Sequence, residues 1–175
     1  PHQGAGYHEV DDMEINKLYE AHYGVPVPSH IGYKIPEMFN AAIDGSLKAL
    51  WLIGEDVVQT DPNTNKVIKA MESLELLVVQ ELFMTETAQY ADVILPGASF
   101  LEKSGTFTNG ERRVQRVNAV VEPLSGTKPD GQIILDIMER YAAKTGRKSG
   151  NAKTTYEPAW ILDDTSRIVP FFTAV

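Results

Sequence analysis

Three short apolar segments, separated by helix-forming segments, constrain the fold of this chain more than any other feature. The apolar segments are residues 49–53, 76–79 and 92–95. Residues 62–74 lie between the first two and carry apolar side chains at helical spacing, and residues 85–91 suit a shorter helix before the third. Strands that alternate with helices in this way predict an α/β fold. We expect an open, mostly parallel, Rossmann-like sheet with helices on both faces and right-handed crossovers.

Helix boundary signals organise the rest of the chain. Asp61 and Pro62 predict the N-cap and the first residue of the helix over 62–74. Four further helices are expected, over residues 13–23, 35–42, 132–144 and 158–169. We therefore expect one domain with three parts: a helical lead-in over residues 1–48, an α/β core over 49–145, and a C-terminal helix and tail over 146–175.

The composition excludes several classes of protein. A net charge of −8 without a run of lysine or arginine argues against a nucleic-acid-binding or anionic membrane surface, although backbone amides and local cations could still bind a nucleotide. The chain has no cysteine, which excludes disulfides, zinc fingers and iron–sulfur ligation within it. No apolar run reaches the roughly 18 residues of a membrane-spanning helix. The 175 residues begin without Met or a signal peptide, so we expect an excised part of a longer polypeptide.

The segment after the third apolar run is rich in charged side chains and glycine. Residues 92–115 read DVILPGASFLEKSGTFTNGERRVQ, so the expected strand ends at a Pro-Gly pair and a polar loop with two further glycines follows. Lys103, Arg112 and Arg113 lie with neighbouring carboxylates around these turns, as expected of a loop that encloses a large polar ligand. The alternative is that at least one arginine forms a structural ion pair with a nearby glutamate.

Ligands of open parallel sheets bind beyond the carboxyl ends of the strands. The end of the first expected strand offers Gly54, Glu55, Asp56, Gln59 and Thr60. Gly54 lets the backbone turn sharply, and the Asp56 carboxylate can accept hydrogen bonds from a base edge or from ribose hydroxyls. These residues could equally do no more than form the turn and cap the following helix.

The later part of the chain offers two further sets of candidates. Gln80, Glu81 and Thr85 follow the second strand, where dinucleotide-binding folds hold a ribose diol with an acidic residue, although a capping role is favoured for Thr85. In the third set, Lys103 could contact a phosphate. Asp130 opens the amphipathic helix that follows it, either as an N-cap alone or as a cap that also contacts a ligand.

Several familiar motifs are missing from the sequence. No G-x-G-x-x-G follows the first strand, which weighs against an ordinary NAD or FAD site, and no P-loop or G-x-S-x-G is present. The histidines are scattered and lack metal-ligand spacing. We therefore expect neither a catalytic residue nor a metal ligand in this chain.

Longer stretches of the sequence resemble a known family. They read LWLIGEDVVQTDPN, then LLVVQELFMTETAQYADVILPGASFLEKSGTFTNGERRVQ, then KPD before a helix. These stretches closely resemble the molybdopterin oxidoreductase family, and most of all the catalytic alpha subunit of formate dehydrogenases. The resemblance is dense over residues 49–145. It implies one of the two central α/β domains of those enzymes, which grips the guanosine end of one molybdopterin guanine dinucleotide.

The resemblance also implies roles for individual residues. Residues at the matching family positions lie at the dinucleotide, and here they are Asp56, Thr60, Gln80, Glu81, Lys103 and Asp130. Asp130 would hydrogen-bond the guanine edge, where N1–H and N2–H lie side by side and a carboxylate can accept from both. Such a pair discriminates against adenine by about 1–3 kcal/mol. Recognition through guanine would let an acidic chain bind an anionic ligand.

The implied activity belongs to a larger enzyme. Formate dehydrogenases of the family use molybdenum or tungsten, a cysteine or selenocysteine ligand and an iron–sulfur cluster to oxidise formate to CO2 with electron transfer. Because this chain has no cysteine, we expect the isolated chain to be inactive. Its expected partners are the rest of the catalytic subunit and electron-transfer subunits, with no nucleic acid and no membrane contact. The alternatives are the same domain of a nitrate reductase or quinone-oxidoreductase large subunit, or a stand-alone interaction module.

Overall fold

The computed structural model describes residues 3–147 and 153–169, which pack as two compact units. The sheet unit consists of Tyr33–Ser99 and Pro123–Asp130. The hairpin unit consists of Pro1–Gly32, Phe100–Glu122 and Gly131–Val175. These units divide the chain differently from the ranges 1–48, 49–145 and 146–175, whose membership of one domain stays a prediction. The expected tail from residue 170 onward lies outside the described residues.

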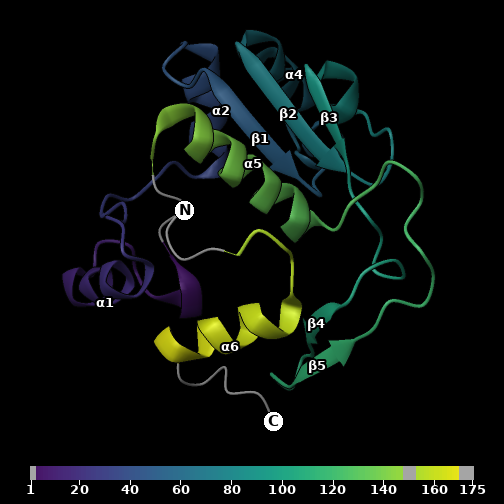
Figure 1. The fold of residues 1–175 in the computed structure, drawn as a ribbon. Coiled ribbons are helices and arrows are strands. Elements are labelled where there is room, and N and C mark those ends of the chain that lie inside the picture. Colours follow the sequence, from purple (N-terminus) through teal and green to yellow (C-terminus); the bar gives the residue numbers. More distant parts are fainter. Residues whose placement is uncertain (1–2, 148–152, 170–175) are drawn as a thin grey trace. The chain divides into compact units, whose positions relative to one another are not determined.

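A three-stranded parallel sheet organises the sheet unit (Figure 1). β1 (Ala49–Ile53) and β3 (Val93–Pro96) flank β2 (Leu76–Glu81), so the order of the strands in space equals their order in the sequence. Trp51 of β1 lies opposite Val78 of β2. The expected α/β fold with a parallel sheet is confirmed.

Helices pack on one face of this sheet. They are α2 (Ile35–Ile43), α3 (Val57–Thr60), α4 (Thr64–Ser73) and the short 3-10 helix η2 (Thr87–Tyr90). Leu77 and Val79 project from the same side of β2, because successive side chains of a strand alternate between faces. Both are buried in one apolar cluster with Val67 and Met71 of α4 and Phe39 of α2. Burial of each large apolar side chain contributes about 1.5–3 kcal/mol, which fixes the strands and so the positions of their ends.

The helix expected over residues 62–74 begins two residues later, at Thr64. Asp61 follows α3, and its carboxylate accepts a hydrogen bond from the backbone amide of Asn63 at 2.8 Å. Asn63 is the N-cap of α4 and accepts from the backbone amide of Lys66 at 3.2 Å. The prediction of Asp61 as N-cap and Pro62 as first helical residue was wrong, because Asp61 closes an Asx turn that leaves Pro62 in a bend.

A β-hairpin and helices build the hairpin unit. Its elements are η1 (Ala5–Tyr7), α1 (Met13–Tyr23), the antiparallel pair β4 (Gly105–Thr108) and β5 (Val114–Val117), and α6 (Pro158–Ile168). α5 (Asp130–Thr145) begins at the last residue of the sheet unit and continues in the hairpin unit. The four helices expected outside residues 49–95 are confirmed to within a few residues. No helix in the described ranges is both long and apolar enough to cross a membrane.

The hairpin lies where the sequence predicted an irregular loop, so that part of the prediction was wrong. Asn109 closes its turn, because its side-chain oxygen accepts hydrogen bonds from the backbone amides of Glu111 and Arg113 at 3.0 and 2.9 Å. Arg112 between them has a φ of 62°, an uncommon conformation for a residue other than glycine. The expected ion pairs of Arg112 and Arg113, and the enclosure of a ligand by this segment, stay predictions.

Candidate functional site

The carboxyl ends of the three strands carry most of the predicted site residues. We define the strand-end cluster as Asp56, Gln80, Glu81, Thr87, Gly97 and Asp130, all in the sheet unit. The chain leaves β1 through Gly54, whose φ of 64° lies in the left-handed region that glycine adopts readily. The backbone amide of Gly54 donates to the carbonyl oxygen of Gln80 at 2.9 Å, which joins the ends of β1 and β2.

Asp56 is held by Thr87, which the sequence did not predict as a site residue. The Asp56 Oδ1 atom accepts hydrogen bonds from the backbone amide and the hydroxyl of Thr87, at 2.9 and 2.5 Å. The same hydroxyl oxygen accepts from the backbone amide of Val58 at 3.0 Å. Thr87 is completely buried. These bonds tie the start of α3 to η2, and the Asp56 side chain does not cap α3 itself.

The surroundings of Asp56 favour its charged form. Desolvation by partial burial raises the pKa of this carboxyl, but the hydrogen bonds from the hydroxyl and the backbone amide of Thr87 lower it, and the pKa lies below its ordinary value. The end of β1 therefore presents a fixed, charged hydrogen-bond acceptor.

The other predicted residues after β1 are exposed. Thr60 Oγ1 lies 2.8 Å from a carboxylate oxygen of Glu55 and 3.0 Å from the carbonyl oxygen of Asp56. The side chains of Glu55, Gln59 and Thr60 all face solvent. They add polar groups beside Asp56 that a ligand can reach.

Gln80 and Asp130 meet at the end of β2. Gln80 Nε2 donates a hydrogen bond to Asp130 Oδ1 at 2.8 Å, although 50 residues separate the two in the sequence. Gln80 is only 1% exposed, and its Oε1 atom is buried with no hydrogen-bond partner among the described residues. A buried acceptor without a partner is uncommon in folded proteins and calls for a physical reason.

A short backbone bridge brings Asp130 to this position. Gly97 and Lys128 form an isolated parallel bridge directly after β3. The amide of Ala98 donates to the carbonyl oxygen of Lys128 at 2.8 Å, and the amide of Lys128 donates to that of Pro96 at 3.2 Å. A Cβ atom at Gly97 would lie 3.1 Å from Asp130 Oδ1, so the missing side chain leaves room for the carboxylate.

Glu81 and Thr85 use local hydrogen bonds. A carboxylate oxygen of Glu81, which is half-buried, accepts from the backbone amide of Leu82 at 2.7 Å. The Thr85 hydroxyl oxygen accepts from the backbone amide of Ala88 at 3.2 Å, at the start of η2. Thr85 therefore bonds to the first turn of η2 from one residue before its N-cap, which is Glu86, and the structure brings Glu81 and Thr85 to the same loop after β2.

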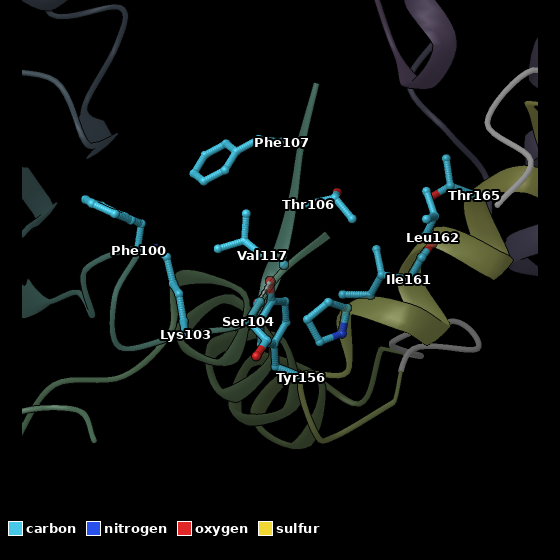
Figure 2. Close-up of a pocket in the computed structure, with 12 residues that line it drawn as sticks. Phe100, Lys103, Ser104, Thr106, Phe107, Val117, Tyr156, Ile161, Leu162 and Thr165 are labelled. Carbon is cyan, nitrogen blue, oxygen red and sulfur yellow. Dashed lines mark hydrogen bonds between the residues drawn. The ribbon is translucent and has the colours of Figure 1, made fainter. Parts of the chain in front are cut away.

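Lys103 belongs to the hairpin unit, whereas the strand-end cluster is defined within the sheet unit. It lines a cavity of about 370 Å³ with Phe100, Phe107 and Tyr156, which Figure 2 shows. The Tyr156 hydroxyl donates to the carbonyl oxygen of Ser104 at 3.4 Å. Aromatic and aliphatic side chains form most of the lining, which suits an apolar group better than a phosphate.

The residues that the sequence did not single out share a simple property. Thr87 acts through a buried hydroxyl, Gly97 through its missing side chain, and Lys128 through its backbone hydrogen bonds. No sequence motif marks any of these roles. The spacing T-x-T before the third strand is the one local hint for Thr87. Among residues 3–147 and 153–169, no three His, Asp or Glu side chains converge as a metal site requires.

Known proteins are similar to this chain in sequence and in fold. The family model of the molybdopterin oxidoreductases matches residues 7–140. The provisionally named oxidoreductase YjgC of Bacillus subtilis is 41% identical over 176 residues, and a protein of Staphylococcus haemolyticus, provisionally named a formate dehydrogenase, is 39% identical over 175 residues. This chain is matched in full but spans only 17% of each relative. Among solved structures, acetylene hydratase from Pelobacter acetylenicus has a similar fold, with a TM-score of 0.56 and 26% sequence identity. The match covers 76% of this chain and 19% of the hydratase chain.

Thr87→Val tests the hydrogen bonds that hold Asp56. The substitution keeps the shape of the side chain but removes a donor to Asp56 and an acceptor for Val58, so we expect a loss of about 2 kcal/mol in the free energy of unfolding, measured in urea. Thr87→Ser restores the hydroxyl and should recover at least half of that loss. Equal stability of Thr87→Val and the native chain would contradict this role.

The lowered pKa of Asp56 predicts how the stability of the fold depends on pH. Because its pKa is lowered in the folded chain, the charged form stabilises the fold above the ordinary carboxyl pKa of about 4, and this contribution is lost as the pH falls through the lower folded value. Asp56→Asn should be less stable at pH 7 and should lose less stability on acidification. Urea unfolding at pH 7, 4 and 3 measures both effects, and parallel pH profiles for the two chains would rule out the contribution of Asp56.

Proposed function

The chain belongs to the molybdopterin oxidoreductase family, and on this basis we propose that it is part of the catalytic subunit of a formate dehydrogenase. The relatives named for formate support this assignment at 38–39% identity over the whole chain. They are about six times longer than the segment that they share with it, since the segment is 17% of their length. Oxidation of formate would therefore be an activity of the larger protein.

Within that protein, we infer that the sheet unit holds the guanosine part of a molybdopterin guanine dinucleotide. The observation that carries this inference is the Gln80–Asp130 pair, in which Gln80 donates to Asp130 Oδ1 and so holds a carboxylate acceptor at the carboxyl end of the sheet. Guanine offers the complementary donors, N1–H and N2–H, side by side. The free volume at Gly97 lies against the same carboxylate. The donor and acceptor chemistry of the residues present thus fits the guanine edge.

The remaining candidates would bind the sugar and its neighbours. Glu81 ends β2, where an acidic side chain can accept hydrogen bonds from ribose hydroxyls. Asp56 and Thr60 would contact the nucleotide from the end of β1, and Gly54, Glu55, Gln59 and Thr85 would shape the two loops. Lys103, in the hairpin unit, would lie near the ligand. The bound cofactor would supply the redox-active molybdenum or tungsten centre, while this chain would bind and orient its nucleotide end.

Recognition through the base explains how an acidic chain binds an anionic ligand. The net charge is −8, which disfavours phosphate groups at long range. Hydrogen bonds from guanine to Asp130 and from ribose to Glu81 use the carboxylates as acceptors, so the negative charges that repel phosphate also confer the selectivity. The metal ligand and the iron–sulfur cluster would come from elsewhere in the subunit, since this chain has no cysteine.

The fold alone does not choose the reaction. Acetylene hydratase has a similar fold, and its name gives a hydration rather than an oxidation. Formate is favoured here because it stands in the names of several relatives at 38–39% identity, whereas the hydratase is 26% identical. If the two tests below fail, the chain would instead be assigned to a nitrate reductase or quinone-oxidoreductase large subunit, or to a stand-alone interaction module.

Nucleotide binding tests the role of the sheet unit. Calorimetry with GMP and AMP should show that the chain prefers GMP by about tenfold or more, because only guanine can donate twice to Asp130. Asp130→Ala should abolish the preference. Asp163→Ala is the matched control, since Asp163 is an exposed aspartate of α6 paired with Arg167, and it should leave binding unchanged. Equal affinity for GMP and AMP, or no binding at millimolar nucleotide, would favour an interaction module.

The reaction itself is tested on the full-length catalytic subunit that contains this chain. With its cofactor bound, the subunit should reduce an artificial electron acceptor in the presence of formate. The same preparation should neither oxidise the reduced acceptor with nitrate nor hydrate acetylene. Activity with nitrate or acetylene but not with formate would assign a different member of the family.

A further inference from the structure

Gln80 is a polar residue at a position where β2 buries its side chain almost completely. Only 1% of the residue is exposed. A buried amide without full hydrogen bonding is unfavourable, and an apolar side chain of the same size would avoid this penalty. The single side-chain hydrogen bond described for Gln80 runs to Asp130 at 2.8 Å. An apolar side chain could pack at this position as well as Gln80 does. The specific contribution of the amide is therefore its hydrogen bond to Asp130.

The chemistry of the pair fixes which way the amide faces. An ionised carboxylate only accepts hydrogen bonds, so the nitrogen of the amide must face Asp130 and the oxygen must face away. This orientation explains why Gln80 Oε1 is left buried without a partner. The unmet acceptor is the cost of directing the donor at the carboxylate.

Three contacts within the sheet unit restrict the Asp130 side chain. Gln80 donates to its Oδ1 atom. A Cβ at Gly97 would lie 3.1 Å from this oxygen, so glycine leaves room for it. The bridge between Gly97 and Lys128 fixes the backbone two residues before Asp130. These three features restrict the orientations that the carboxylate can adopt.

We propose that Gln80 is a positioning residue, which holds the Asp130 carboxylate so that the site accepts a purine with a 2-amino group. This inference rests on the proposed binding of guanosine and refines the role expected for Gln80. The resemblance implied only that Gln80 lies at the dinucleotide. The burial of Gln80 favours action through Asp130, which is the residue that would meet the guanine.

The test compares three nucleotides that differ only at the base. GMP offers N1–H and N2–H, IMP offers N1–H alone, and AMP offers neither in that place. Gln80→Met removes the amide and keeps a flexible apolar side chain of similar length. We expect the affinity for GMP, measured by calorimetry, to fall about tenfold, and the affinity ratio of GMP to IMP to approach one, while the affinity for AMP stays unchanged.

A double-mutant cycle shows whether Gln80 acts through Asp130. If it does, Gln80→Met should change GMP affinity by less than about twofold in an Asp130→Asn background, because the carboxylate that it orients is already gone. Independent tenfold losses from the two substitutions would instead indicate direct contact of Gln80 with the base and would overturn the positioning role.

The outcomes separate this inference from the proposed function. If the native chain does not prefer GMP, the guanosine site itself is wrong, and the positioning role fails with it. If the preference depends on Asp130 but survives Gln80→Met, the site stands and the role of Gln80 is overturned. If Gln80→Met weakens GMP, IMP and AMP equally, Gln80 is merely structural, which also overturns the role.

A second variant covers the case in which Gln80→Met does not fold, which circular dichroism and urea unfolding detect. Gln80→Leu removes the donor to Asp130 and keeps a compact apolar side chain. It should lose the preference for GMP over IMP. A Gln80→Leu chain that is folded and still prefers GMP by the native ratio would refute the positioning role.

Discussion

The burial of polar side chains at the carboxyl ends of the strands is the constraint on which the candidate site depends. Gln80 and Thr87 are enclosed by protein, and buried polar groups require hydrogen-bond partners. Gln80 bonds to Asp130, and Thr87 bonds to Asp56 and Val58. Each bond joins segments that are distant in the sequence. These bonds therefore also place two carboxylates at the carboxyl end of the sheet.

Local signals were sufficient to predict most of the elements. The helix that ends before Gly24 and the strand over 49–53 have the predicted bounds, because a glycine in the left-handed conformation and an uninterrupted apolar run mark them clearly. The break before α4 was missed because Asp61 and Asn63 are both good capping residues, and only the folded chain shows which one caps. The hairpin was missed because its strands are four residues long and its glycines also fit a loop.

The candidate site was predictable in part. The strand ends, the residues on them and the family could be inferred from the sequence, and the family is confirmed. The pairings could not, because they span 31 residues for Asp56 with Thr87 and 50 residues for Gln80 with Asp130. The assignment of Lys103 to the hairpin unit also required the structure. Contact of any of these residues with a ligand stays a prediction.

The position of β1 affects how this segment behaves outside the larger protein. Among the described strands, β1 pairs with β2 alone and so forms an edge of the sheet. Backbone amides and carbonyls along its outer side are then available to another strand. In a full-length subunit such an edge lets the sheet continue, whereas in a separately produced segment it favours self-association that grows with concentration.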